Sequence, residues 1–205
     1  MNKKAIYNLT YGLFVLTARC GEKDNGCIIN TAGQVTSTPN RISITVNKDN
    51  FTHDMIMESG KFNISILSEK ASFDTFKHFG FRSGKTVDKF EGYSAAKRSE
   101  NGIYYITEGT NSYISATVEK TLDLGTHTMF IAAVDDMEVL TDEPSASYAY
   151  YQSSIKPQPE DKASQGKTAW RCTVCGYIYE GEELPADFIC PLCKHPASDF
   201  EKVTV

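Results

Sequence analysis

The sequence lacks the glycine motifs with which many proteins bind nucleotide phosphates. Gly-x-Gly occurs nowhere in the 205 residues, although the chain contains 14 glycines. The Gly-x-Gly-x-x-Gly turn of dinucleotide-binding folds is therefore absent, as is a Gly-x4-Gly-Lys-Ser/Thr phosphate loop. These absences exclude a Rossmann domain and a P-loop nucleotide-binding domain, so any phosphorylated ligand must be bound in another way.

The chain also has no long apolar run and no excess of positive charge. No stretch approaches the roughly 20 apolar residues that span a bilayer. The formal net charge of −5 argues against nucleic acid and anionic membranes as partners. Residues 1–20 carry two lysines before an apolar stretch, but polar residues interrupt that stretch and no small-residue cleavage site follows. We expect this segment to be the first element of the fold and the protein to be cytoplasmic.

The first 150 residues contain a series of short β-prone segments. They are rich in Ile, Val, Thr, Tyr and Phe, and clusters of Gly, Asn or Asp separate them. The predicted strands are 13–17, 41–46, 62–67, 103–107, 113–120 and 126–134. Two helices are predicted, one from a cap at Asn50 or Thr52 to Gly60 and the other from a cap at Ser68 to Gly80. Many strands with two helices indicate a mainly β fold, and a barrel is favoured because closure removes exposed edges.

A change in composition divides the chain. Residues 151–168 contain two prolines, several serines and a charged run without an apolar period, which is typical of a linker. The predicted organisation is therefore a body at 1–150, a linker at 151–168 and a small module at 169–205.

Four of the six cysteines form two Cys-x-x-Cys pairs in this module. They are Cys172, Cys175, Cys190 and Cys193. In a cytoplasmic protein such pairs indicate a metal site rather than disulfides. Each pair can place two sulfurs on one ion, and two pairs complete a tetrahedral site that also stabilises a very small fold. The spacing alone leaves zinc and iron open, because the ligand set suits both.

The residues around the cysteines resemble the rubredoxin family. The matching features are Cys-x-x-Cys-Gly-Tyr at 172–177, an acidic segment with a glycine at 180–183, and Cys-Pro-Leu-Cys at 190–193. The loop between the pairs is shorter than in free-standing rubredoxins and is similar to that of the rubredoxin domain of rubrerythrins. The resemblance implies one iron ion held by four thiolates, which carries single electrons and cannot accept a hydride. An upstream group must then supply electrons one at a time.

Residues 27–67 of the body have the composition of a site for a phosphorylated planar ligand. Short polar side chains lie beside the predicted strands at Asn30, Thr31, Thr36 and Ser37. Residues 50–53 open a helix, whose first N–H groups favour a phosphate, and Lys48 adds a positive charge. Structural alternatives stay open, because Asn and Thr also cap helices, Thr and Ser form turns, and surface lysines are commonly solvated.

In this order the segments resemble the flavin-reductase-like FMN-binding family, which has a split β-barrel fold and usually forms homodimers. The resemblance covers about residues 5–150 and is carried by Asn30-Thr31, VTSTPNRISITVNKDNFTHD (35–54), FRSGKTVDKF (81–90) and Gly125-Thr126-His127. It implies that two groups of residues bind FMN. Those near the ring and its polar edge are Asn30, Thr31, Val35, Thr36 and Ser37; those toward the phosphate are Asn47, Lys48 and Thr52.

His127 is the candidate catalytic residue. It matches a Gly-Asp-His element that lies, in the resembled family, near the approach of the nicotinamide, with Thr126 here in place of the Asp. The alternative is that His127 is a packed or surface histidine of a strand. Cys27 has two interpretations as well, a position near the flavin or a small buried hydrophobic residue, the latter being the default.

A flavin body followed by a rubredoxin module is similar to the high-molecular-weight rubredoxins of anaerobic bacteria. The resemblance implies electron transfer from NAD(P)H, or from a reductase, to FMN, to a mononuclear Fe(Cys)4 centre and on to a redox partner such as a flavodiiron NO/O2 reductase. FMN takes electrons in pairs and can release them singly, so it connects the two modules. The alternatives are a ligand-binding β-barrel with a structural zinc ribbon, and a passive carrier that does not oxidise NADH.

Overall fold

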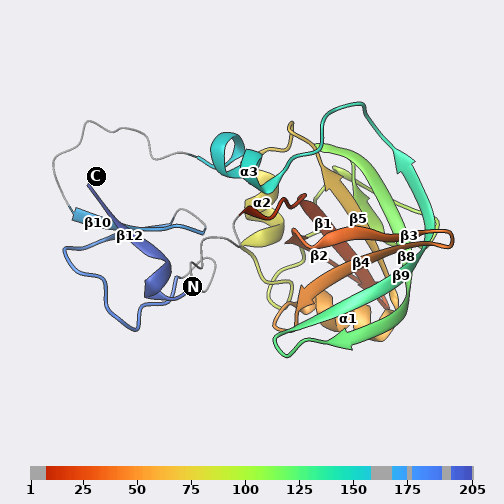
Figure 1. The fold of residues 1–205 in the computed structure, drawn as a ribbon, viewed down its shortest axis with the longest axis horizontal. Helices are drawn as coiled ribbons and strands as arrows, with labels where there is room; N and C mark the ends of the chain where they lie inside the picture. The colour runs from red at the N-terminus through yellow and green to blue at the C-terminus, as the bar shows by residue number, and fades with distance from the viewer. Residues whose placement is uncertain (1–7, 158–167, 175–176, 191–194, 205) are drawn as a thin grey trace. The chain divides into compact units, whose positions relative to one another are not determined.

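The computed structural model describes residues 8–157, 168–174, 177–190 and 195–204 (Figure 1). The chain forms two compact units, Met1–Ile155 and Lys156–Val205, called unit 1 and unit 2 below. Cys175, Cys193, the start of the N-terminal segment and most of the expected linker lie outside the described residues. Within the described ranges, no helix has the length and apolar character that crossing a membrane would require.

Unit 1 is built on a seven-stranded sheet in the order β2-β1-β5-β8-β9-β4-β3, with every neighbouring pair antiparallel. Its strands are β1 (Phe14–Cys20), β2 (Lys23–Ile29), β3 (Ala32–Ser37), β4 (Asn40–Asn47), β5 (Lys61–Leu67), β8 (Thr110–Asp123) and β9 (His127–Val139). A separate hairpin consists of β6 (Ala96–Arg98) and β7 (Tyr104–Ile106). The predicted mainly β fold is confirmed.

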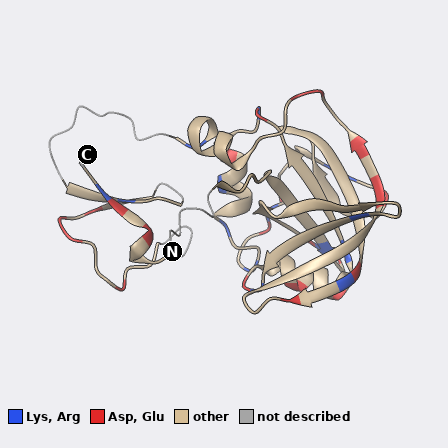
Figure 2. Ribbon diagram, viewed as in Figure 1, with Lys and Arg blue, Asp and Glu red and all other residues tan. Residues whose placement is uncertain are grey.

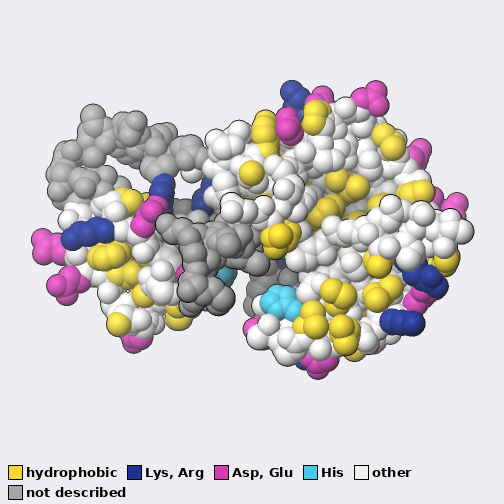
Figure 3. All heavy atoms as spheres, in the orientation of Figure 1, with side chains coloured by type: hydrophobic (Ala, Val, Ile, Leu, Met, Phe, Trp, Pro, Cys, Tyr) yellow, Lys and Arg dark blue, Asp and Glu magenta, His cyan; other side chains and the backbone are white. Residues whose placement is uncertain are grey.

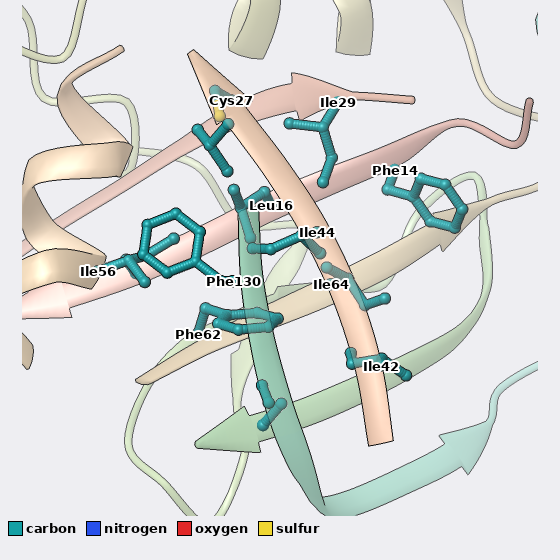
Figure 4. Packing of buried hydrophobic residues seen from close by; sticks show 14 of the residues in the cluster. Phe14, Leu16, Cys27, Ile29, Ile42, Ile44, Ile56, Phe62, Ile64 and Phe130 are labelled. Carbon is teal, nitrogen blue, oxygen red and sulfur yellow. The ribbon is translucent and has the colours of Figure 1, made fainter. Parts of the chain in front are cut away.

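The sheet curls around one hydrophobic core. Ile29 of β2 and Ile44 of β4 belong to the same buried cluster, although four strands separate β2 from β4 in the sheet (Figure 4). Phe62 and Phe130 fill the centre of this cluster and are fully buried. Strands so far apart can share a core only if the sheet bends back on itself. The described structure therefore has the curvature of a barrel, with β2 and β3 at its two edges.

Helix α1 (Phe51–Ser59) packs on this core through Met55 and Ile56. It begins where predicted, because the Asn50 side chain accepts a hydrogen bond from the backbone N–H of Thr52. It ends at Gly60, whose φ of 69° is the left-handed conformation that glycine adopts without steric cost.

Helix α2 (Phe73–Gly80) begins later than predicted. Ser68 is not its cap, since it forms a β-bridge with Ser145 and its N–H donates to the carbonyl of Gly109. Ser72 stands at the helix start instead. The extended conformation that the bridge imposes on Ser68 is incompatible with a helical turn.

The end of unit 1 differs from the expected linker. A short helix α3 (Tyr148–Tyr150) continues into a π-helical turn η2 (Tyr151–Ile155). Tyr151 is buried in a second core cluster, with its ring centroid 4.4 Å from that of Phe76. Residues 151–155 are therefore part of the packed unit, because an aromatic anchor that composition did not reveal holds them to α2.

Unit 2 is a small three-stranded sheet. Its strands are β10 (Thr168–Cys172), β11 (Ile178–Glu180) and β12 (Phe200–Thr204), in the order β11-β10-β12, and a 3-10 turn η3 (Ala197–Asp199) precedes β12. A small aromatic core supports this sheet, since the ring of Phe188 lies 4.8 Å from that of Tyr179 and 5.4 Å from that of Phe200. So few apolar contacts leave much of the folding free energy to other interactions.

Candidate functional site

The two cysteine pairs of unit 2 begin in equivalent loops. Cys172 ends β10, and its N–H donates a 2.8 Å hydrogen bond to the carbonyl of Tyr177, five residues later. Cys190 has the same relationship to His195, also at 2.8 Å and five residues later. Both cysteines are fully buried. The second cysteine of each pair, Cys175 and Cys193, lies outside the described residues.

Neighbouring contacts fix each loop to the small sheet. The N–H and the hydroxyl of Thr173 both donate to the carbonyl of Asp199, at 2.8 and 2.9 Å. Ile189 forms a β-bridge with Pro196 across the second loop. We refer to the loops that begin at Cys172 and Cys190 as the first and second knuckles.

The two described cysteines are compatible with a thiolate metal site. Two sulfurs at the start of two equivalent loops are fully buried in a unit whose aromatic core is small. A buried thiolate is costly unless a cation compensates its charge, and a metal ion supplies that charge and cross-links the fold. The donor chemistry accommodates either iron or zinc.

The residues expected near a flavin ring lie along the β3–β4 hairpin. Thr31 donates its hydroxyl to the carbonyl of Thr45 at 2.6 Å, and Thr36 donates to that of Pro39 at 2.6 Å. Val35 and Ser37 are exposed on β3, and Asn30 is half-buried just before it. The hydrogen bonds from these two threonine hydroxyls therefore stabilise the hairpin.

This hairpin also provides a free sheet edge. Strand β3 pairs only with β4 among the described strands, so the backbone N–H and C=O groups on its outer side are available. Five of its six residues are exposed. An edge of this kind offers alternating donors and acceptors, which is chemistry compatible with the polar rim of an isoalloxazine ring.

Two of the residues expected at the phosphate, Asn47 and Lys48, lie with His127 at one end of the sheet. Asn47 is the register partner of His127 between β4 and β9. The N–H of Lys48 donates to the carbonyl of Thr126 at 3.0 Å, and the Thr126 hydroxyl lies 2.8 Å from Nδ1 of His127. The structure thus brings together three of the predicted site residues.

The ammonium of Lys48 has an acidic neighbour. Nζ of Lys48 lies 2.7 Å from Oδ1 of Asp123, and Asp123 also accepts from the N–H of Gly125. Both contacts lower the pKa of Asp123, the lysine contributing most. Lys48 is partly exposed, so its charge remains accessible to an anion.

Thr52 takes a different position from the one expected. Its side chain is fully buried, and its hydroxyl oxygen accepts a 2.9 Å hydrogen bond from Nδ2 of Asn25 on β2. A side chain without exposed surface offers nothing to a phosphate outside the barrel. The observed contacts therefore support a structural role for Thr52 in joining α1 to β2.

Cys27 takes the default role foreseen for it. It is buried in the main core, and burial raises the pKa of its thiol above the ordinary value. It therefore stays protonated at neutral pH and behaves as a small hydrophobic residue.

Sequence reasoning missed one buried charge, that of Lys89. Its Nζ donates to the carbonyls of Gly26 at 2.7 Å and Phe79 at 2.9 Å, and burial lowers its pKa to about 8. The segment 81–90 contains three cationic side chains at similar spacing, and nothing in it distinguishes the buried one. Lys89 ties this segment to β2 and to the end of α2.

Known protein families match both units. Residues 6–158 match the family described as "Flavin reductase like domain", and residues 170–201 match "Rubrerythrin, rubredoxin-like domain". The second match agrees with the short loop noted between the cysteine pairs.

Two curated relatives and one solved structure illustrate the similarity. A high molecular weight rubredoxin of Moorella thermoacetica is 35% identical over 99% of this chain and 100% of its own. A ferric-chelate reductase (NAD(P)H) of Archaeoglobus fulgidus is 36% identical over 74% of this chain and 89% of its own. The NADH:FAD oxidoreductase SgcE6 of Streptomyces globisporus has a similar fold, with a TM-score of 0.63 and 20% identity, over 71% of this chain and 85% of its own.

Proposed function

The chain belongs to the flavin reductase-like proteins and, over its full length, to the high-molecular-weight rubredoxins, and from this premise we propose that it is an electron-transfer oxidoreductase. Electrons come from NAD(P)H or a separate reductase, enter through FMN in unit 1, pass to one iron ion in unit 2 and leave to a redox partner protein. The observation that carries this proposal is the presence of two equivalent, buried cysteine knuckles in the same chain as a flavin reductase-like barrel.

Unit 1 provides the residues that hold the flavin. The outer edge of β3 binds the polar rim of the ring, with Asn30, Thr31, Val35, Thr36 and Ser37 around it. Asn47 and the ammonium of Lys48 face the phosphate, and Thr52 supports α1 from inside. FMN, when bound, supplies the capacity to take a hydride as an electron pair and to release the electrons singly.

Unit 2 provides the one-electron site. Cys172, Cys175, Cys190 and Cys193 hold the iron ion, which supplies a couple that changes by one electron. The four exposed carboxylates Glu180, Glu182, Glu183 and Asp187 lie in the segment leading to the second knuckle, and Figure 2 marks acidic positions in red along the ribbon of unit 2. These carboxylates and the half-exposed Ile189 form a surface that would complement a partner protein with basic residues around an apolar centre. Our candidate for this partner is a flavodiiron protein.

His127 acts where the electron donor, NAD(P)H, approaches the flavin. It stands at the same end of the sheet as Asn47 and Lys48, and its Nδ1 is oriented by the hydroxyl of Thr126. We assign it to positioning the nicotinamide of NAD(P)H, which is the step that separates this proposal from a passive carrier.

We also propose that the protein is a cytoplasmic homodimer formed through unit 1. Several large apolar side chains of unit 1 are about half exposed or more. They lie on β3, on β8, in the turn after β8 and on β9, and Figure 3 shows hydrophobic side chains in yellow on the surface of unit 1. They are Val35, Leu122, Leu124, Met137 and Val139. A second copy of the chain that covered these side chains would remove apolar surface from water, and a second copy is the occupant that the family resemblance suggests.

Metal assay and an anaerobic spectrum of the untagged, as-purified protein test the proposal. The expected result is one iron per chain with ferric-thiolate absorption, together with one extractable FMN. Zinc at the four cysteines and no extractable flavin would favour the alternative, a ligand-binding barrel with a structural zinc ribbon.

A further inference from the structure

The side chain of Lys156 contacts the backbone of the first knuckle. This lysine is the first residue of unit 2, and its Nζ donates to the carbonyl of Thr173 at 3.0 Å and to that of Val174 at 3.2 Å. Thr173 and Val174 are the two residues between Cys172 and Cys175. An ammonium group therefore binds both intervening carbonyls of one Cys-x-x-Cys pair.

The other described cations of unit 2 are engaged differently. Arg171 forms an ion pair with Glu201, and Lys202 lies over the ring of Trp170, 5.9 Å from its centroid. Among the lysines and arginines in the described ranges of unit 2, Lys156 is the one that contacts the knuckle in this way: its side chain donates to two knuckle carbonyls. Its half-buried position limits screening of its charge by solvent and salt.

We propose that Lys156 is a positioning residue that raises the reduction potential of the metal centre. The inference rests on the proposed function, in which the four cysteines hold iron. Reduction adds one electron, supplied by the reduced flavin, to the ferric ion and yields the ferrous ion; no bond is formed or broken. The net charge of the ion with four thiolates changes from −1 to −2, so a fixed positive charge beside it stabilises the reduced form more than the oxidised form.

The two hydrogen bonds act in the same direction. The peptide unit that carries the Thr173 carbonyl also carries the N–H group of Val174. A cation at the carbonyl oxygen polarises a peptide and makes its N–H a stronger donor. Stronger donors around thiolate ligands favour the more negatively charged, reduced state.

A redox titration of the holoprotein, followed through the ferric-thiolate absorption, tests this role. Lys156→Met removes the charge with little change in side-chain length, and Lys156→Arg retains it. At a fixed solution potential we expect Lys156→Met to lower the ratio of reduced to oxidised iron on the order of tenfold, equivalent to about 59 mV for one electron. Lys156→Arg should stay within about threefold of the native ratio.

Lys202→Met is the matched control, because it removes the same charge from unit 2 without touching a described knuckle residue. Equal shifts for Lys156→Met and Lys202→Met, or no shift in Lys156→Met, would overturn the inference while leaving the electron-transfer proposal in place. If Lys156→Met loses its iron, Lys156→Gln is titrated instead with the same expectation. A native centre that does not titrate as a one-electron couple would refute the proposed function itself.

Discussion

Asn47 and His127 are partners across the β4–β9 ladder, at the last position of one strand and the first of the other. This pairing places a candidate phosphate ligand and the candidate catalytic histidine at the same end of the sheet, although 80 residues separate them in sequence. Antiparallel pairing therefore brings together, at one end of the candidate site, two segments that each resemble the same family.

Replacing His127 tests the donor step. We expect His127→Asn to slow flavin reduction by NADH on the order of 10- to 100-fold, since it removes the group that we propose to position the nicotinamide. Anaerobic stopped-flow absorbance measures the rate, and the ferric-thiolate spectrum should be unchanged. His78→Asn, the same substitution elsewhere in unit 1, serves as the control. Equal rates in the two variants would assign His127 to packing alone.

The Lys48–Asp123 ion pair predicts that substitutions at Lys48 change the affinity for FMN but not the affinity for riboflavin. Lys48→Met should weaken FMN binding about tenfold, near 1.4 kcal/mol, while riboflavin, which lacks the phosphate, should bind within about twofold of native. Asp123→Asn should strengthen FMN binding, because it releases the ammonium from a carboxylate 2.7 Å away. Fluorescence titration of the flavin-free protein measures both. Equal losses for FMN and riboflavin in Lys48→Met would place the phosphate elsewhere.

Lys89 predicts a pH-dependent stability. Burial lowers its pKa from 10.5 to about 8, so between these values the unfolded chain binds more protons than the folded protein. The free energy of unfolding therefore gains a contribution that rises with pH across this window and is flat below it. We expect the difference in unfolding free energy, native minus Lys89→Met, to increase from pH 8 to pH 10.5.

Denaturant titration of the holoprotein, with the unit 1 transition followed by flavin release, measures this difference. Taking the difference cancels the titration of shared groups that do not interact with Lys89, such as Tyr93. Lys85→Met, an exposed lysine in the same segment, should show no such slope. A difference for Lys89→Met that is constant with pH would contradict the burial of the charge.

Cys172→Ser separates the two units. It removes a buried sulfur of the first knuckle, and we expect iron content and the ferric-thiolate spectrum to be lost, because metal ligation stabilises so small a fold. Flavin reduction by NADH should remain within about twofold of native, since unit 1 has its own core. Cys20→Ser, outside both pairs, is the control. Loss of flavin reduction in Cys172→Ser alone would show that the units do not function in this order.

The sequence predicts those features that local chemistry determines. The cap at Asn50 and the end of α1 at Gly60 follow from residue type and spacing. The strand β3 was missed because an exposed edge strand carries polar residues without the alternation of a half-buried one.

Features set by tertiary contacts could not be predicted in the same way. Ser68 has the sequence of a cap but is held extended by Ser145, and Thr52 resembles a phosphate ligand but turns inward to Asn25. Lys89 is buried, while Lys85 in the same segment is exposed. In each case a partner distant in sequence decides the outcome.

Anaerobic mixing of NADH with the as-purified protein, recording flavin and ferric-thiolate absorbance together, tests the relay most directly. We expect flavin absorbance to be lost first and the ferric-thiolate band then to disappear without any added carrier. Flavin bleaching with a persistent ferric band, or a protein whose four cysteines hold no iron, would contradict it.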